Sequence, residues 1–143
     1  LGLVGGVAVF LGWGFRVLVE HKCVDLLQPE TCALVGITEY QKVLSMAHSH
    51  FVPVVNHVWG SAIAVATNIH LLASMPDLPG GAHPVQPMLE YDTTPNRFRE
   101  DLLVHSLDVL SQVKDKDGMI GLPKGHGLCI EPDMSFIQKK LIR

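Results

Sequence analysis

The sequence is short of charge, of aromatic side chains and of long uninterrupted apolar runs. Only 17% of its 143 residues are charged, 6% are aromatic, and the formal net charge is -3. A nucleic-acid partner is not indicated, because binding to phosphates requires a surface enriched in Lys and Arg. Since 48% of the residues are hydrophobic, the chain can instead bury a sizeable core, and its length is typical of one domain.

Cysteine is also scarce. The sequence contains three cysteines, an odd number, and no C-x-x-C pair: Cys23, Cys32 and Cys129. This argues against a disulfide framework and against a zinc site. We expect reduced thiols in a cytoplasmic protein. The pair His48 and His50 has no third candidate ligand nearby, so the sequence predicts no metal site there either.

The apolar opening run LGLVGGVAVFLGWGF contains five Gly and is interrupted well before the roughly 20 residues that a membrane-spanning helix needs. It also lacks the basic start and the cleavage site of a signal peptide. The sequence therefore predicts a buried strand with a Gly-rich turn, and no membrane segment. Because the chain begins inside this strand and without Met, we expect it to be a piece of a longer protein.

Short apolar segments alternate with helical patterns through residue 92. The periodicity predicts strands at the start and over 23–30, 51–57 and 88–92, and helices over 14–22, 36–50 and 61–75. This alternation is typical of an α/β fold made of parallel βαβ units, with both faces of the sheet covered. Beyond residue 92, Asp117-Gly118 predicts a turn before a short strand, and 134–143 a final helix.

Ionisable residues stand where three of the predicted strands end, namely Glu30, His57 and Glu90, whereas the first strand ends near Val7. The carboxyl ends of parallel strands share one edge, where functional groups gather. A His beside a carboxylate can act as a general acid or base. A second carboxyl group that apolar surroundings keep protonated can donate a hydrogen bond to a developing anion.

Structural roles are open to each of these residues taken singly. His57 could be a simple hydrogen-bonding residue, Glu30 could cap its loop, and Glu90 could pair with Arg97 or Arg99. Their common position at the ends of successive strands favours a shared site. The other histidines do not lie at predicted strand ends. His70 lies inside the predicted apolar helix, and we interpret it as a hydrogen-bonded core or surface residue.

Three motifs carry a resemblance to a known family: HVWGSAIA (57–64), LEYDTTPNRFR (89–99) and DGMIGLPKGHGLCIE (117–131). Over about residues 12–135 the chain resembles the C-terminal part of the mandelate racemase and muconate lactonizing enzyme family of the enolase superfamily. It is most similar to the mandelate racemase-like branch, which includes acid-sugar dehydratases.

The resemblance implies a partial (β/α) TIM-type barrel, about the last three strand–helix units, over residues 1–92. Residues 93–143 would pack on the barrel and contribute to the family's capping domain. In this family a base removes the proton α to a carboxylate of a small acid or acid sugar, and Mg²⁺ stabilises the resulting enediolate. The resemblance makes His57 the catalytic His, puts Glu30 in place of the Asp that hydrogen-bonds it, and makes Glu90 the partner of the substrate carboxylate.

Several positions depart from the family pattern. Val7 stands where the family has a Glu that binds Mg²⁺, and a valine has no oxygen donor. The other metal ligands and the Lys-x-Lys base would lie upstream of Leu1. Glu30 has one methylene more than the usual Asp, a change that can misplace His57 by about 1 Å. Other departures are Ala33 for a basic residue, Val35 and Cys129 for Gly, and His126 for Pro.

These departures leave two interpretations. The chain is the C-terminal part of a Mg²⁺-dependent dehydratase or racemase and is inactive by itself, with no metal bound. Alternatively, it is a truncated or decayed non-catalytic homologue. Because a half barrel exposes strand edges and apolar surface, it could also self-associate into a homo-oligomer.

Overall fold

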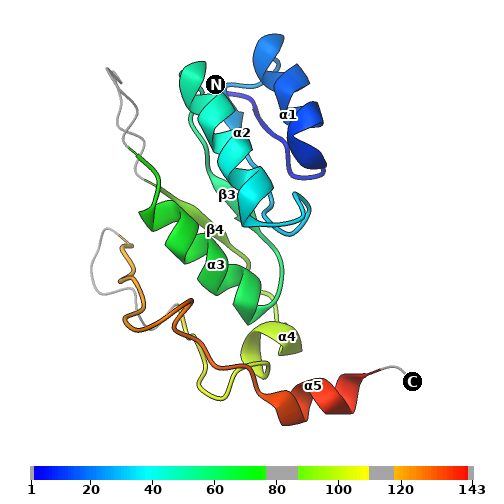
Figure 1. Cartoon of the computed structure of the whole chain (residues 1–143), viewed down its shortest axis with the longest axis vertical. Coiled ribbons are helices and arrows are strands. Elements are labelled where there is room, and N and C mark those ends of the chain that lie inside the picture. Colours follow the sequence, from blue (N-terminus) through cyan, green and yellow to red (C-terminus); the bar gives the residue numbers. More distant parts are fainter. Residues whose placement is uncertain (1, 77–86, 110–117, 142–143) are drawn as a thin grey trace.

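The computed structural model describes residues 2–76, 87–109 and 118–141. Strands and helices alternate as the sequence predicts, which confirms the α/β class. Helices α1 and α2 lie side by side at the upper end of the molecule, α3 lies below them, and α4 and α5 lie at the lower end (Figure 1). The elements are β1 (Val4–Gly5), α1 (Leu11–Glu20), β2 (Leu26–Leu27), α2 (Ile37–Ser49), β3 (Asn56–Val58), α3 (Ala62–Ala73), β4 (Leu89–Tyr91), α4 (Arg97–Glu100) and α5 (Met134–Lys140).

The strands are parallel and adjacent in chain order. β1 pairs with β2, and β3 pairs with β4 with His57 opposite Glu90. Parallel bridges from Leu27 to Val54 and from Glu30 to His57 join β2 to β3. Successive strand ends, and the side chains that follow them, therefore lie along one edge.

The strands are shorter and less buried than the sequence predicts. β2 contains two residues instead of eight, and Pro29, which has no N–H to donate, follows shortly after it. Both faces of the sheet were expected to be covered, but this is wrong for the described chain, because Val4 in β1 is 48% exposed and Glu90 in β4 is also exposed. The helices cover one face of the strands. In β3, for example, Asn56 and Val58 point to the covered face and are buried, whereas His57 points to the other face and is half-buried.

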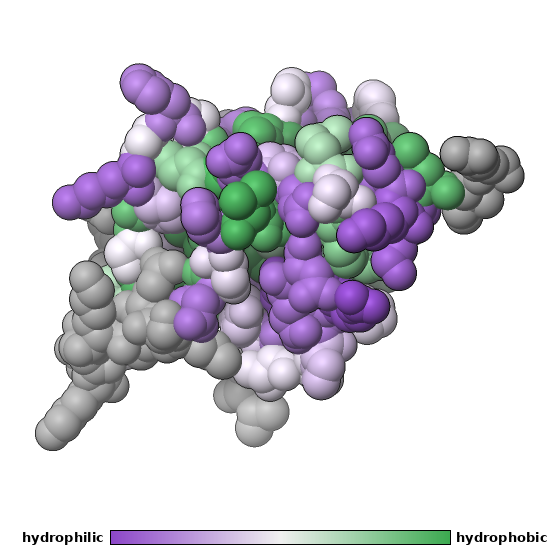
Figure 2. Space-filling view, turned by 90° about the horizontal axis from the view of Figure 1, so that it is seen from below, coloured by the Kyte–Doolittle hydropathy of each residue, from purple (hydrophilic) through white to green (hydrophobic). Residues whose placement is uncertain are grey.

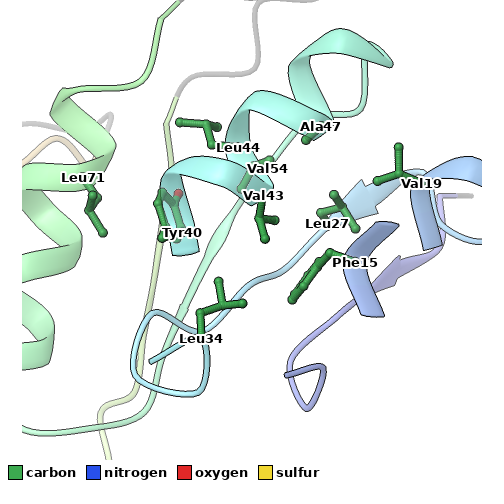
Figure 3. Packing of buried hydrophobic residues seen from close by; sticks show 10 residues of the cluster. All are labelled: Phe15, Val19, Leu27, Leu34, Tyr40, Val43, Leu44, Ala47, Val54 and Leu71. Atoms are coloured by element: carbon green, nitrogen blue, oxygen red, sulfur yellow. The ribbon is translucent and has the colours of Figure 1, made fainter. Parts of the chain in front are cut away.

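The main core lies between α1, α2 and the strands (Figure 3). Phe15 from α1 and Tyr40 from α2 are its largest fully buried side chains. Each buried Leu, Val or Phe contributes about 1.5–3 kcal/mol relative to an exposed one. The cluster consists of Phe15, Val19, Leu27, Leu34, Tyr40, Val43, Leu44, Ala47, Val54 and Leu71.

A second cluster joins the segment beyond residue 92 to α3 through Val109, which packs with Val58 and Val65. α5 is held to α4 by an edge-on contact of Phe136 with Phe98. At this end of the molecule, seen from below, apolar surface lies exposed among polar residues (Figure 2). No helix in the described ranges is long and apolar enough to cross a membrane.

The short strand predicted after Asp117-Gly118 is wrong, because residues 118–124 contain no strand; Asp117 itself lies outside the described residues. The predicted final helix is confirmed as α5. The start of the first helix was placed three residues late, since α1 begins at Leu11.

Non-glycine residues with positive φ follow α1, α2 and the turn after β2. They are Lys22 at φ 52°, Phe51 at φ 56° and Val35 at φ 65°. After each of the two helices, the amides of the positive-φ residue and of the residue that follows it donate hydrogen bonds to carbonyls of the last helical turn. This is the C-terminal helix motif in which the positive-φ position is usually glycine. Val35 is the most strained of the three, because a β-branched side chain tolerates this region worst.

We expect Val35→Gly to raise the free energy of unfolding by about 1 kcal/mol, because glycine adopts this conformation without the steric penalty. Val35 is 79% exposed, so little packing is lost. Thermal unfolding followed by circular dichroism measures the change. Val17→Gly, at an exposed position inside α1, is the matched control and should destabilise by about 0.5 kcal/mol. Equal effects of the two substitutions would contradict the strain at Val35.

Candidate active site

Three polar side chains from three neighbouring strands meet at the sheet edge. The Nδ1 atom of His57 lies 2.8 Å from Oε2 of Glu90. The same oxygen accepts a hydrogen bond from the side-chain amide of Gln28. Gln28 follows β2, His57 lies in β3 and Glu90 lies in β4, so one carboxylate oxygen links all three strands.

The fold places His57 at this edge because side chains alternate along β3. Asn56 and Val58 point into the buried layer, and His57 points the other way with its side chain 19% exposed. The Glu90 carboxylate, 48% exposed, only accepts hydrogen bonds, so Nδ1 of His57 carries the proton. In the neutral ring the other nitrogen, Nε2, is then the proton acceptor.

Glu30 is next to this pair in the sheet, but its carboxylate makes other hydrogen bonds. Its backbone forms the bridge to His57, whereas its two carboxylate oxygens accept from the amides of Cys32 at 3.1 Å and Ala33 at 2.8 Å. The long glutamate arm folds back and caps the turn that follows β2. Within the described chain, His57 is thus hydrogen-bonded to Glu90 and not to the Glu30 carboxylate, and the catalytic roles of the three residues stay predictions.

Gln28 is the site residue that the sequence analysis missed. A signal for it was present, because residues 28 and 30 fall on the same face of an extended segment. An amide does not titrate, so a pattern of ionisable residues at strand ends does not include it. An amide donor can nevertheless orient a carboxylate, and here it fixes the oxygen that also receives His57.

The segment after β4 is held by a separate ion pair. The buried Arg99 guanidinium lies 3.1 Å from Oδ2 of Asp92 and over the Tyr91 ring. The backbone amide and hydroxyl of Thr94, followed by Arg99, lower the pKa of Asp92 from 3.8 to about 2. Glu90 therefore pairs with neither Arg97 nor Arg99, because Arg97 pairs with Asp101 instead.

The remaining candidates lie apart from this group. Val7 is 37% exposed in the turn after β1. His50 Nδ1 lies 3.0 Å from the Met46 carbonyl, and His70 Nε2 lies 3.3 Å from the Leu128 carbonyl. In the part of the chain that the structure describes, no three His, Cys, Asp or Glu residues are grouped so as to hold a metal ion.

Comparison with known proteins settles the family. A family model described as enolase C-terminal domain-like matches residues 2–136. The chain belongs to this family. It is 36% identical over 129 residues to D-galactarolactone cycloisomerase of Agrobacterium fabrum, an alignment that covers 90% of this chain and 32% of that protein.

Solved structures agree with the family assignment. The 3,6-anhydro-D-galactonate cycloisomerase of Zobellia galactanivorans is 30% identical, with a TM-score of 0.79, and the match covers 100% of this chain and 36% of that one. L-Talarate dehydratase of Polaromonas sp. JS666, complexed with Mg and L-glucarate, shares the fold at 20% identity, with a TM-score of 0.71 over 96% of this chain and 32% of that one. The enolase-family domain thus spans about a third of the length of its relatives.

The Glu30 carboxylate lies close to the thiol of its neighbour Cys32. Partial burial, and after it the Glu30 carboxylate, raise the pKa of the Cys32 thiol. We expect Glu30→Gln to lower that pKa, so that more thiolate is present at a given pH and Cys32 reacts several-fold faster with iodoacetamide at pH 8. Peptide mass spectrometry over a pH series measures the rate, with Cys23 as the internal reference.

The matched control is Glu90→Gln, which makes the same chemical change away from Cys32. An alkylation rate unchanged by Glu30→Gln, or raised equally by Glu90→Gln, would contradict the placement of Glu30 over its own turn.

Proposed function

We propose that this domain supplies the acid–base histidine of an enzyme that moves the proton α to the carboxylate of an acid sugar or its lactone. The observation that carries the proposal is the His57–Glu90 pair at the shared edge of the parallel strands. The relatives support the substrate class, since their names specify galactarolactone, xylonate and talarate. The parallel strands β1 to β4 of the described residues, which follow chain order, support a segment of a (β/α) barrel over residues 1–92. We propose further that residues 93–143 contribute to the cap.

In this proposal His57 works through the nitrogen that Glu90 leaves free. Glu90 accepts a hydrogen bond from Nδ1–H and stabilises the positive charge that the ring gains when Nε2 takes a proton. Gln28 holds the shared oxygen of Glu90 in place. The family role of Glu90, a hydrogen bond to the substrate carboxylate, requires a protonated carboxyl group and is therefore an alternative to this pairing with His57.

The residues present do not fit the Mg²⁺ ion that this family employs. Mg²⁺ requires oxygen ligands, and the one family ligand position within this chain holds Val7. No step of the proposal therefore runs through a metal bound by this chain. We propose that the chain alone does not catalyse the reaction, and that activity requires the part of the relatives that it does not span.

A second candidate is a non-catalytic homologue, and Val7 and Val35 favour it. Both replace residues that the family pattern uses for a specific purpose, a metal ligand and a positive-φ glycine. Trp13 in α1 and Phe10 just before it are 75% and 67% exposed, so this candidate includes self-association through exposed apolar surface and open strand edges.

A chimera separates the two candidates. This chain replaces the matching third of the Agrobacterium fabrum cycloisomerase, once with Val7 and once with Val7→Glu. We expect exchange of the substrate α-proton with deuterium, measured by NMR with D-galactarolactone, only in the Val7→Glu chimera. His57→Asn in that chimera should abolish exchange by at least about 100-fold, whereas the control His21→Asn, at the exposed end of α1, should keep it.

Exchange that survives His57→Asn would contradict the role of this residue. A folded Val7→Glu chimera without exchange would favour the non-catalytic homologue.

A further inference from the structure

Directly behind the site, on the face of β3 turned away from His57, lies a buried cluster of polar side chains. Thr31 is 3% exposed, and Tyr40, Asn56 and Asn68 are fully buried. They come from four different segments: the turn after β2, helix α2, strand β3 and helix α3. Polar groups this deeply buried are costly unless they are hydrogen-bonded.

Asn68 is the centre of this cluster. Its Oδ1 accepts from the hydroxyl of Thr31 and from the amide of Asn56, each at 2.8 Å. Its Nδ2 donates to the Ala64 carbonyl at 2.9 Å, which fixes the orientation of the carboxamide. The Tyr40 hydroxyl donates to the remaining amide oxygen, that of Asn56.

The chain positions of the two donors give the cluster its significance. Thr31 follows Glu30, and Asn56 precedes His57. One oxygen of Asn68 therefore ties the turn that follows β2, three residues after Gln28, to β3 directly beside His57. The backbone bridge between Glu30 and His57 makes the same connection from within the sheet.

The site on the other face draws its side chains from the same two segments. Gln28 reaches Glu90 from β2, and His57 reaches the same Glu90 oxygen from β3. A shift of β2 against β3 would lengthen one of the two hydrogen bonds, and such bonds weaken steeply with distance and angle.

We propose that Asn68 is a positioning residue that holds the ends of β2 and β3 in the relative placement at which His57 and Gln28 share Glu90. The catalytic meaning of this role rests on the proposed function, but the geometric effect does not. Its action passes through the Thr31 hydroxyl and the Asn56 amide and involves no contact of Asn68 with substrate.

The test is a crossed pair of substitutions at Thr31 in the full chain labelled with ¹⁵N-histidine. Thr31→Val keeps the shape and removes the hydroxyl, whereas Thr31→Ser keeps the hydroxyl and removes the methyl group. Long-range ¹H–¹⁵N NMR reports which ring nitrogen of His57 carries the proton, and the signals are assigned with His57→Gln. Asn68→Leu, which removes both acceptor and donor, is examined in the same way.

We expect His57 protonated at Nδ1 in the unsubstituted chain and in Thr31→Ser. In Thr31→Val and Asn68→Leu the signals should shift toward the Nε2–H form. Three results would each overturn the proposal. The first is that the His57 signals do not shift in Thr31→Val, and the second is that they shift equally in Thr31→Val and Thr31→Ser. The third is that the unsubstituted chain lacks the Nδ1–H form. If Asn68→Leu does not fold, the Thr31 pair still decides. Because no activity is measured, an inactive chimera would refute the proposed function without affecting this result.

Discussion

The parallel register of β3 against β4, which sets His57 opposite Glu90, is the constraint on which the candidate site depends. Side chains paired across neighbouring strands come within contact distance, so the register alone brings an imidazole to a carboxylate. A slip of one residue would send His57 into the helix layer and Asn56 to the edge. The apolar cluster around Phe15, Tyr40 and Val54 makes such a slip costly, because it would expose the core face of the strand.

The two faces of the same strands thus have different tasks. One face is closed by α1, α2 and α3 and contains both the apolar core and the hydrogen-bonded cluster around Asn68. The other presents Gln28, His57 and Glu90. Beyond β4, the backbone that follows Glu90 is held by the pairing of Asp92 with Arg99 and by the hydrogen bonds that the Thr94 amide and hydroxyl donate to Asp92. The site is therefore supported from the helix layer and from the chain beyond it.

Much of this arrangement could be predicted from the sequence. The alternating periodicity located every helix and strand up to β4, and the rule that parallel strands end at one edge singled out His57 and Glu90. The predicted ends of the first two helices, residues 22 and 50, lie close to the observed ones, Glu20 and Ser49. The positive-φ conformation that follows each helix could not be predicted, because Lys22 and Phe51 stand where glycine is usual. The hydrogen bonds of Glu30 escaped prediction for a different reason: the length of its side chain lets it cap its own turn, and nothing in the pattern distinguishes that from reaching His57.

The most direct test of this account is a double-mutant cycle between His57 and Glu90 in the full chain. The free energy of unfolding is measured by chemical denaturation at pH 6 for the unsubstituted chain, His57→Gln, Glu90→Gln and the double variant. The account predicts a favourable coupling energy, about 0.5–1 kcal/mol for a half-exposed pair. A coupling energy of zero within error would show that the two side chains do not interact, and the site would then lose the pair on which it is built.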